Sequence, residues 1–211
     1  MLNSKEIKLV LNRLYEVYPD AKCELNHENP FQLIIATVLS AQTTDKKVNQ
    51  VTERLFKKCI SPEDFLSLSQ EELEIEIKEI GLYRSKAKHI QGLCRALILN
   101  FNREVPSKME ELLSLDGVGR KTANVVLSNA FNVPALAVDT HVFRVSNRIG
   151  LAKGKDVLEV EKQLMENISK KDWIKAHHTL IFHGRNICKA IKPSCHICTI
   201  NQFCKFYDSK K

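Results

Sequence analysis

Long apolar runs and signs of β-structure are both missing from this sequence. No stretch approaches the roughly 18 to 20 uncharged apolar residues of a membrane span, and the start, Met1–Glu6, lacks the apolar core of a signal peptide. No alternating strand pattern, internal repeat, low-complexity tract or flexible linker occurs. We therefore expect neither a membrane protein nor a β-rich fold, but a soluble intracellular protein.

The bulk composition is that of a folded chain with an anionic partner. With 211 residues, 44% of them hydrophobic, the chain can form one large domain or two small ones. Its formal charge of +7 and pI near 9.0 favour a polyanion such as nucleic acid, although many unrelated soluble proteins are equally basic.

Apolar residues recur at three- and four-residue intervals, which predicts an all-α fold of roughly nine or more helices. The segment Phe31–Leu39 is apolar nearly all round and predicts a central buried helix. Helix starts are predicted at capping residues Asn29, Asp45, Ser61, Ser107 (in a capping box with Glu110) and Asp139. Later helices are expected over residues 120–130, 156–168 and 171–183.

A glycine-containing turn between two predicted helices is the most specific local signal. Two of only seven glycines, Gly117 and Gly119, flank Val118 and are followed directly by Arg120 and Lys121. Glycines allow a tight turn and a close approach, and the amides at the following helix start attract a phosphate. The turn predicts a sequence-independent grip on DNA, with an ordinary helix-turn-helix connection as the alternative.

Lys121 is a candidate nucleophile in the first turn of that second helix. To attack a sugar it must be a neutral amine, whereas the unperturbed pKa of lysine is about 10.4. The helix start, the charge of Arg120 and partial desolvation each disfavour the ammonium form. Taken by itself, Lys121 is better explained as a solvated surface charge.

Asp139 is a candidate catalytic carboxylate within Val138-Asp139-Thr140-His141. Its simplest role is an N-cap, and a capped aspartate can also stabilise a developing positive charge on a sugar. Gln42 and Leu82 are candidate wedges that fill the gap left by a base extruded from the duplex. For each of them an exposed loop residue is the plain alternative.

Four of the seven cysteines crowd into the last quarter of the chain, whereas Cys23, Cys59 and Cys94 are scattered. Disulfides are not expected in an intracellular chain, so the spacing Cys-x6-Cys-x2-Cys-x5-Cys indicates a metal centre. Zinc with four thiolates is the alternative, and the single close pair favours an iron-sulfur cluster. The four predicted ligands are Cys188, Cys195, Cys198 and Cys204.

Together these motifs resemble the endonuclease III family over nearly the whole chain. The matching segments are Ser40–Asp45, Gly81–Tyr83, Leu115–Lys121, Val138–His141 and the four cysteines. The resemblance implies a helix-hairpin-helix DNA glycosylase that removes oxidised or ring-damaged pyrimidines, such as thymine glycol, and cuts 3′ to the abasic site by β-elimination. Many members carry proline where this chain has Asp116, which puts the strength of the phosphate grip in doubt.

The resemblance also implies residue roles, domains and partners. Lys121 is the expected nucleophile, Asp139 the catalytic aspartate, and the four cysteines the ligands of a [4Fe-4S] cluster. A six-helix domain is expected over 22–133, and a cluster domain over 1–21 with 134–211. The expected partner is double-stranded DNA with damaged pyrimidines or abasic sites, bound by a monomer in a bacterial-type cytoplasm at the nucleoid. An adenine glycosylase and a zinc-stabilised DNA-binding module are the rival readings.

Overall fold

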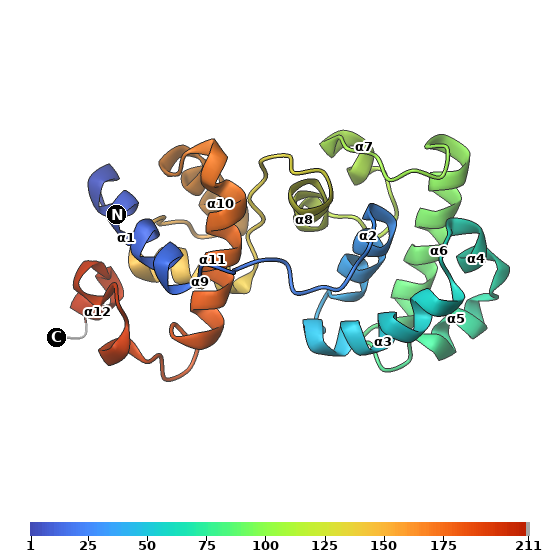
Figure 1. The fold of residues 1–211 in the computed structure, drawn as a ribbon, viewed down its shortest axis with the longest axis horizontal. Coiled ribbons are helices and arrows are strands. Elements are labelled where there is room, and N and C mark those ends of the chain that lie inside the picture. The colour runs from blue at the N-terminus through green and yellow to red at the C-terminus, as the bar shows by residue number, and fades with distance from the viewer. Residues whose placement is uncertain (210–211) are drawn as a thin grey trace. The chain divides into compact units, whose positions relative to one another are not determined.

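The computed structural model describes residues 1–209, so Lys210 and Lys211 lie outside the described part of the chain. Within that part every regular element is a helix, and the predicted all-α class is confirmed (Figure 1). Contacts divide the chain into a central unit, Cys23–Val133, and a terminal unit made of Met1–Lys22 and Pro134–Lys211. Whether each unit folds alone as a domain stays a prediction.

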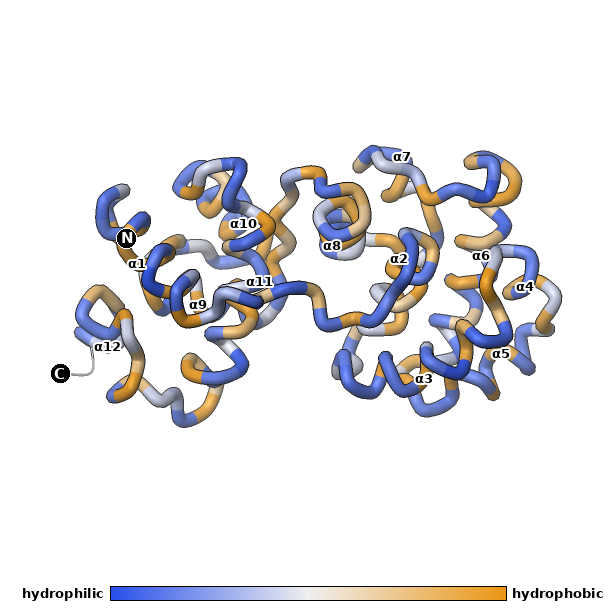
Figure 2. The backbone as a smooth tube through the Cα atoms, viewed as in Figure 1, coloured by the Kyte–Doolittle hydropathy of each residue, from blue (hydrophilic) through white to orange (hydrophobic). Residues whose placement is uncertain are grey.

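The central unit is built around the buried helix predicted from Phe31–Leu39. Its helices are α2 Pro30–Leu39, α3 Asp45–Lys58, α4 Pro62–Ser67, α5 Gln70–Glu76, α6 Tyr83–Asn100, α7 Met109–Leu113 and α8 Arg120–Ala130. Every α2 residue from Phe31 to Leu39 is buried, and α3, α6 and α8 pack against this helix. Figure 2 shows α2 largely in orange, whereas amphipathic α3 is mostly blue.

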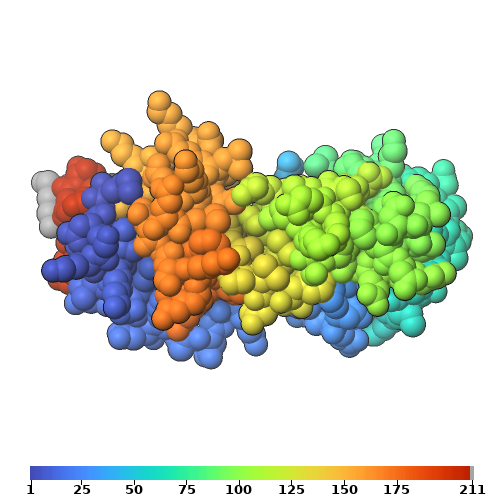
Figure 3. All heavy atoms as spheres, turned by 90° about the horizontal axis from the view of Figure 1, so that it is seen from above, coloured from blue at the N-terminus to red at the C-terminus, as the bar shows by residue number. Residues whose placement is uncertain are grey.

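The terminal unit joins the first helix of the chain to the last third of the sequence. Its helices are α1 Ser4–Val17, α9 Thr140–Ile149, α10 Val157–Asn167, α11 Trp173–Asn186 and α12 Lys205–Asp208, with 3-10 turns η1 Lys170–Asp172, η2 Cys195–Ile197 and η3 Asn201–Phe203. α1 packs on α11, and Figure 3 shows its dark blue atoms beside the orange segment that contains α11. The Leu2 amide also donates to the Gly150 carbonyl at 2.9 Å.

Two predicted N-caps, Asp45 and Ser107, are each wrong by one residue. Helix α3 is capped by Thr44, whose hydroxyl accepts from the Lys47 amide, so Asp45 is the first helical residue. The predicted capping box at Ser107 does not form, because α7 starts after Lys108 and has no side-chain cap. The helix is also only five residues long. The predicted caps Asn29, Ser61 and Asp139 are confirmed.

No helix within residues 1–209 combines the length and the apolar character that a membrane crossing requires.

Candidate functional site

The turn between α7 and α8 has the conformation that its glycines predict. Gly117 has φ 74°, a left-handed value that side chains rarely adopt, and a Cβ added there would lie 2.8 Å from Cβ of His89. Leu115 and Val118 are buried on either side of it and anchor the turn to the core. Gly119 is different: it is the N-cap of α8 with φ −89°, and nothing lies within 4 Å of its Cβ position.

Lys121 is the second residue of α8 and its side chain is exposed. No side chain caps this helix end in the described chain, so the first-turn amides and the helix dipole together form an anion-binding end. Arg120 beside it is also exposed. The hairpin therefore presents backbone donors and two cationic side chains on one short stretch.

Asp116, the residue that departs from the family pattern, has its carboxylate against α6. Its Oδ2 lies 1.9 Å from the position of a Cβ built on Gly92, so the absence of a side chain at Gly92 makes room for it. The acidic group is thus accommodated by packing against α6 within the central unit.

Gln42 and Leu82 share an uncommon backbone conformation. Both are exposed, with φ 56° and 58°, and Leu82 retains 59% of its accessible surface. Left-handed φ values cost non-glycine residues roughly 1–2 kcal/mol, and such strain is concentrated at functional sites. The two residues occupy neighbouring turns, because a Cβ on Gly81 would lie 3.6 Å from the Gln42 carbonyl oxygen.

Asp139 caps α9 in the terminal unit, as predicted. Its Oδ1 accepts from the Val142 amide at 2.8 Å, and within residues 1–209 its Oδ2 has no hydrogen-bond partner. The connector before it is buried, and the Nδ1 of His177 donates to the Ala137 carbonyl at 2.8 Å. The carboxylate is therefore held by one oxygen while the other remains available.

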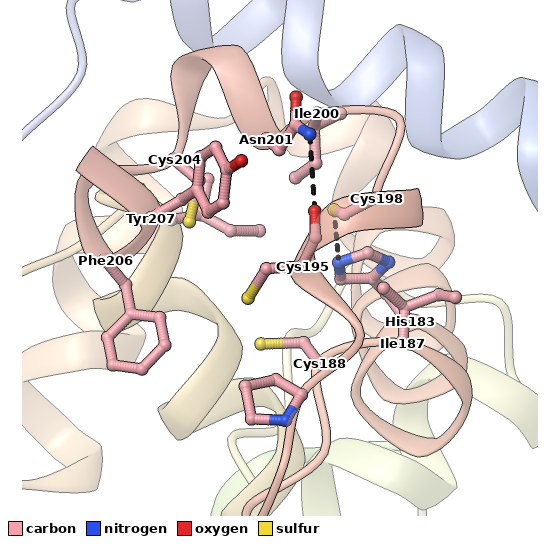
Figure 4. A pocket seen from close by; sticks show the side chains of 12 residues that line it. His183, Ile187, Cys188, Cys195, Cys198, Ile200, Asn201, Cys204, Phe206 and Tyr207 are labelled. Carbon is pink, nitrogen blue, oxygen red and sulfur yellow. Dashed lines mark hydrogen bonds between the residues drawn. The ribbon is translucent and has the colours of Figure 1, made fainter. Parts of the chain in front are cut away.

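The four clustered cysteines line one pocket in the terminal unit. Figure 4 shows the sulfurs of Cys188 and Cys195 pointing into this space, with Cys204 on another side of it. Within the described residues, no three His, Cys, Asp or Glu side chains come close enough to hold a single metal ion. The thiols thus surround a space rather than a point.

A hydrogen-bonded chain connects this pocket to the interior. Sγ of Cys198 lies 3.7 Å from Nε2 of His183 (Figure 4). Nδ1 of His183 lies 3.4 Å from the Tyr18 hydroxyl. Burial lowers the pKa of His183 to about 4, so its ring is neutral and has one donor and one acceptor nitrogen. When Tyr18 donates to Nδ1, Nε2 donates to the sulfur.

The pKa values of the thiols themselves are raised. Burial raises the pKa of Cys198 to about 11 and also raises that of Cys204. Buried thiols of this kind become thiolates when a metal coordinates them, since a coordinating thiol is deprotonated outright. The donor set and the pocket they enclose fit a metal centre.

Two arginines on α9 hold the cysteine segment, and the sequence analysis missed them. Arg144 donates to the Cys188 carbonyl and to the Gly184 carbonyl, both at 3.0 Å. Arg148 donates to the Lys189 carbonyl at 2.7 Å and its guanidinium lies 4.5 Å from the ring centre of Phe206. Arg144 and Arg148 are four residues apart in the sequence and therefore lie on the same face of α9. That spacing could have indicated a shared role.

The comparisons with known proteins give the family. Residues 35–170 match the HhH-GPD superfamily of base excision DNA repair proteins. Endonuclease III of Bacillus subtilis (strain 168) is 54% identical over 206 residues, which cover 97% of this chain and 94% of that protein. The chain belongs to the endonuclease III family. It is therefore a base excision DNA repair enzyme, a DNA glycosylase with an associated lyase.

Further members of the endonuclease III family agree in sequence and in fold. The Escherichia coli (strain K12) protein is 47% identical over 197 residues, 93% of each chain. A solved complex of endonuclease III, trapped as a covalent intermediate with DNA, superimposes with a TM-score of 0.96 at 53% identity, covering 100% of this chain and 99% of that one. The resemblance seen in the motifs is thus confirmed over nearly the whole length.

Proposed function

We propose that this enzyme removes oxidised or ring-damaged pyrimidines from duplex DNA, with Lys121 as its nucleophile, and cleaves the strand 3′ to the resulting abasic site. The observation that carries the proposal is the placement of Lys121, exposed in the first turn of α8 behind a glycine hairpin with an uncapped helix end. The covalent DNA intermediate recorded for the 53% identical family member supports a nucleophile of this kind.

The chemistry assigns one role to each candidate side chain. The neutral Lys121 amine forms a bond to the sugar C1′, and the bond from C1′ to the base breaks, with its electron pair leaving on the base. Asp139 stabilises the positive character of the sugar through its uncapped Oδ2. The lysine adduct opens to an imine, and loss of the acidified sugar proton then expels the 3′ phosphate by β-elimination.

The hairpin and the two strained turns contact the DNA and take no part in the chemical step. Gly117, Val118, Gly119 and Arg120 offer amides and charge to a backbone phosphate. Gln42 and Leu82 enter the base stack and fill the space vacated by the extruded nucleotide. An exposed, preset residue is suited to this because its conformation does not have to be ordered on binding.

The cysteine pocket is proposed to hold a [4Fe-4S] cluster through Cys188, Cys195, Cys198 and Cys204. A single zinc ion would need four sulfurs at about 2.3 Å from one point, whereas an iron-sulfur cluster would be held by the same four thiolates placed around it. All four thiols line one pocket, and within the described residues no three ligand side chains meet at one point, which favours the cluster. When bound, the cluster cross-links the segment covalently, and the steps above do not use its redox chemistry.

The proposed partner is double-stranded DNA containing damaged pyrimidines or abasic sites, bound by a monomer in the bacterial cytoplasm at the nucleoid. The charge of +7 supports this partner. A zinc-stabilised module that only binds DNA is the rival. Broad visible absorption by the purified protein would exclude zinc as the sole metal, and turnover on damaged DNA would exclude a pure binder.

Borohydride trapping tests the proposal directly. We would incubate a duplex containing one thymine glycol with the wild type, with Lys121→Gln and with Lys153→Gln, an exposed lysine outside the hairpin. The expected result is a covalent complex with the wild type and Lys153→Gln only. A complex of equal yield with Lys121→Gln would mean that another amine is the nucleophile, and none with any protein would exclude an imine mechanism.

A further inference from the structure

Lys86 connects the two turns that carry the candidate wedges. It lies one helical turn into α6 from Leu82, and its backbone amide donates to the Leu82 carbonyl at 3.0 Å. Its side chain leaves α6 and reaches the segment after α2, where Gln42 stands. Both turns belong to the central unit.

The ammonium of Lys86 is fully used by that segment. Nζ donates to the Leu39 carbonyl at 2.8 Å, to the Ala41 carbonyl at 2.5 Å and to the Thr43 hydroxyl at 3.3 Å. An ammonium has three N–H donors, and here each has an oxygen acceptor. Two of the three acceptors, on Ala41 and Thr43, immediately flank Gln42 in the chain.

Burying a lysine in this way is costly. Only 3% of Lys86 is exposed, and burial lowers its pKa to about 8. A lysine is rarely buried without a compensating role, because desolvation of its charge disfavours the folded state. The acceptors are grouped at the C-terminal end of α2, where the helix dipole favours a cation. Stabilising that helix end alone would not require contacts to the residues on both sides of Gln42.

We propose that Lys86 is a positioning residue that holds the Gln42 turn and the Leu82 turn together, preset for insertion into the DNA base stack. The inference rests on the proposed function, because it assumes that these two residues are wedges. Gln42 keeps its left-handed φ of 56° while the carbonyl before it and the hydroxyl after it are fixed to α6. Without the three hydrogen bonds from Lys86, the turn would have to become ordered each time the protein binds DNA. The entropy cost of that ordering would reduce the free energy available for base extrusion.

The test compares Lys86→Met, which keeps the chain length but has no donor, with Gln42→Ala and with the double variant. Single-turnover rates are measured on a duplex and on a single strand, each carrying one abasic site. A single strand has no opposite stack to fill, so it reports the chemistry without the wedge. We expect Lys86→Met to lower the ratio of duplex to single-strand rate by about tenfold, and to change it less than about twofold in the Gln42→Ala background.

Amide hydrogen exchange of Thr43, whose amide donates to the Ser40 carbonyl at 3.1 Å, provides a readout that needs no DNA. Its protection should fall in Lys86→Met, while the amides of α2 keep theirs. Thr43→Val removes the weakest of the three acceptors together with the 3.4 Å hydrogen bond from the Thr43 hydroxyl to the Ala41 carbonyl. It should change both readouts in the same direction but less, and it serves if Lys86→Met does not fold.

Three outcomes would overturn the inference: unchanged protection of the Thr43 amide, an equal loss of rate on both substrates, or an equal effect of Lys86→Met with and without Gln42. A different result would overturn the proposed function itself. If wild type and Gln42→Ala gave the same ratio of duplex to single-strand rate, Gln42 would not be a wedge, whatever Lys86 does to the turn.

Discussion

The central and terminal units both contain buried cysteines, but they use them differently. Cys59 and Cys94 in the central unit are packed as small apolar side chains, and burial raises the pKa of Cys94 to about 12. In the terminal unit Cys188 and Cys204 belong to the apolar core and also line the pocket. One core is closed by packing alone, whereas the other borders the thiol-lined pocket that is proposed to hold a cluster. The two units should therefore respond differently to loss of thiols.

The largest expected effect is that of Cys198→Ser. The binding energy of a structural metal centre is folding energy, so losing the proposed cluster should lower the free energy of unfolding of the terminal unit by more than about 4 kcal/mol. Visible absorption should disappear, and amides of α11 should exchange faster while those of α2 stay protected. Cys94→Ala is the matched control and should keep the absorption. If the amides of α2 lost as much protection as those of α11, the stability of the central unit would also depend on Cys198, contrary to this prediction.

The second prediction compares two glycine substitutions in the hairpin of the central unit, one at a tightly packed position and one at an open position. Gly117→Ala places a Cβ at left-handed φ and 2.8 Å from His89, so the free energy of unfolding should fall by about 2–3 kcal/mol. Gly119→Ala meets no atom within 4 Å and loses only the N-cap preference for glycine, so it should lower this free energy by no more than about 1 kcal/mol. Denaturant melts measure both. The hairpin account also expects Gly119→Ala to weaken binding to an abasic duplex, and unchanged affinity would argue against close approach of a phosphate at Gly119.

The third prediction is that the terminal unit loses stability as the pH falls, because of His178. His178 is buried beside His177, and burial lowers its pKa from 6.5 to about 3. The unfolded chain therefore takes up a proton first as the pH falls, and the contribution of neutral His178 to stability is lost progressively below pH 6.5. Between pH 7 and pH 5 this loss is about 2 kcal/mol.

His178→Gln provides the reference for that loss. The difference in unfolding free energy between wild type and His178→Gln should shift by the same amount over this pH range, in favour of the variant at low pH. The histidines of the central unit, His27 and His89, are only half-buried. A pH-independent difference would show that His178 titrates normally in the folded protein.

The smallest expected effect on stability separates the two roles of Asp139. Asp139→Ala removes the cap of α9 and should cost about 1 kcal/mol, whereas Asp139→Asn keeps a capping oxygen and should cost nearly nothing. Base release should fall in both variants, because neither retains the carboxylate charge. Full base release by Asp139→Asn would leave Asp139 as a cap only.

Local chemistry predicted the elements that depend on nearby residues. Helix α2 was predictable because nine consecutive residues are buried and its start is fixed by Asn29 before Pro30. The thiol pocket was predictable from spacing, since four cysteines in one short segment converge with little help from the rest of the chain. The error at Asp45 arose because its neighbour Thr44 is an equally good capping residue, whereas at Ser107 the helix starts one residue later, after Lys108, with no side-chain cap.

What was missed depends on contacts between residues far apart in sequence. Lys86 looks like any surface lysine until α6 is packed beside the end of α2, 45 residues earlier at Ala41. The fit of Asp116 against Gly92 likewise exists only once α6 lies under the hairpin. No local pattern of residues encodes either contact, so the sequence alone could not have revealed them.

The packing of α1 on α11 has a consequence for synthesis. Leu14 is made early, but the other members of its core cluster, such as Leu180 on α11, follow after the whole central unit. At the usual rates of about 5–20 residues per second, this helix waits roughly six seconds or more for its partners. During that interval α1 is an exposed amphipathic segment on the nascent chain, while the central unit already has all its residues.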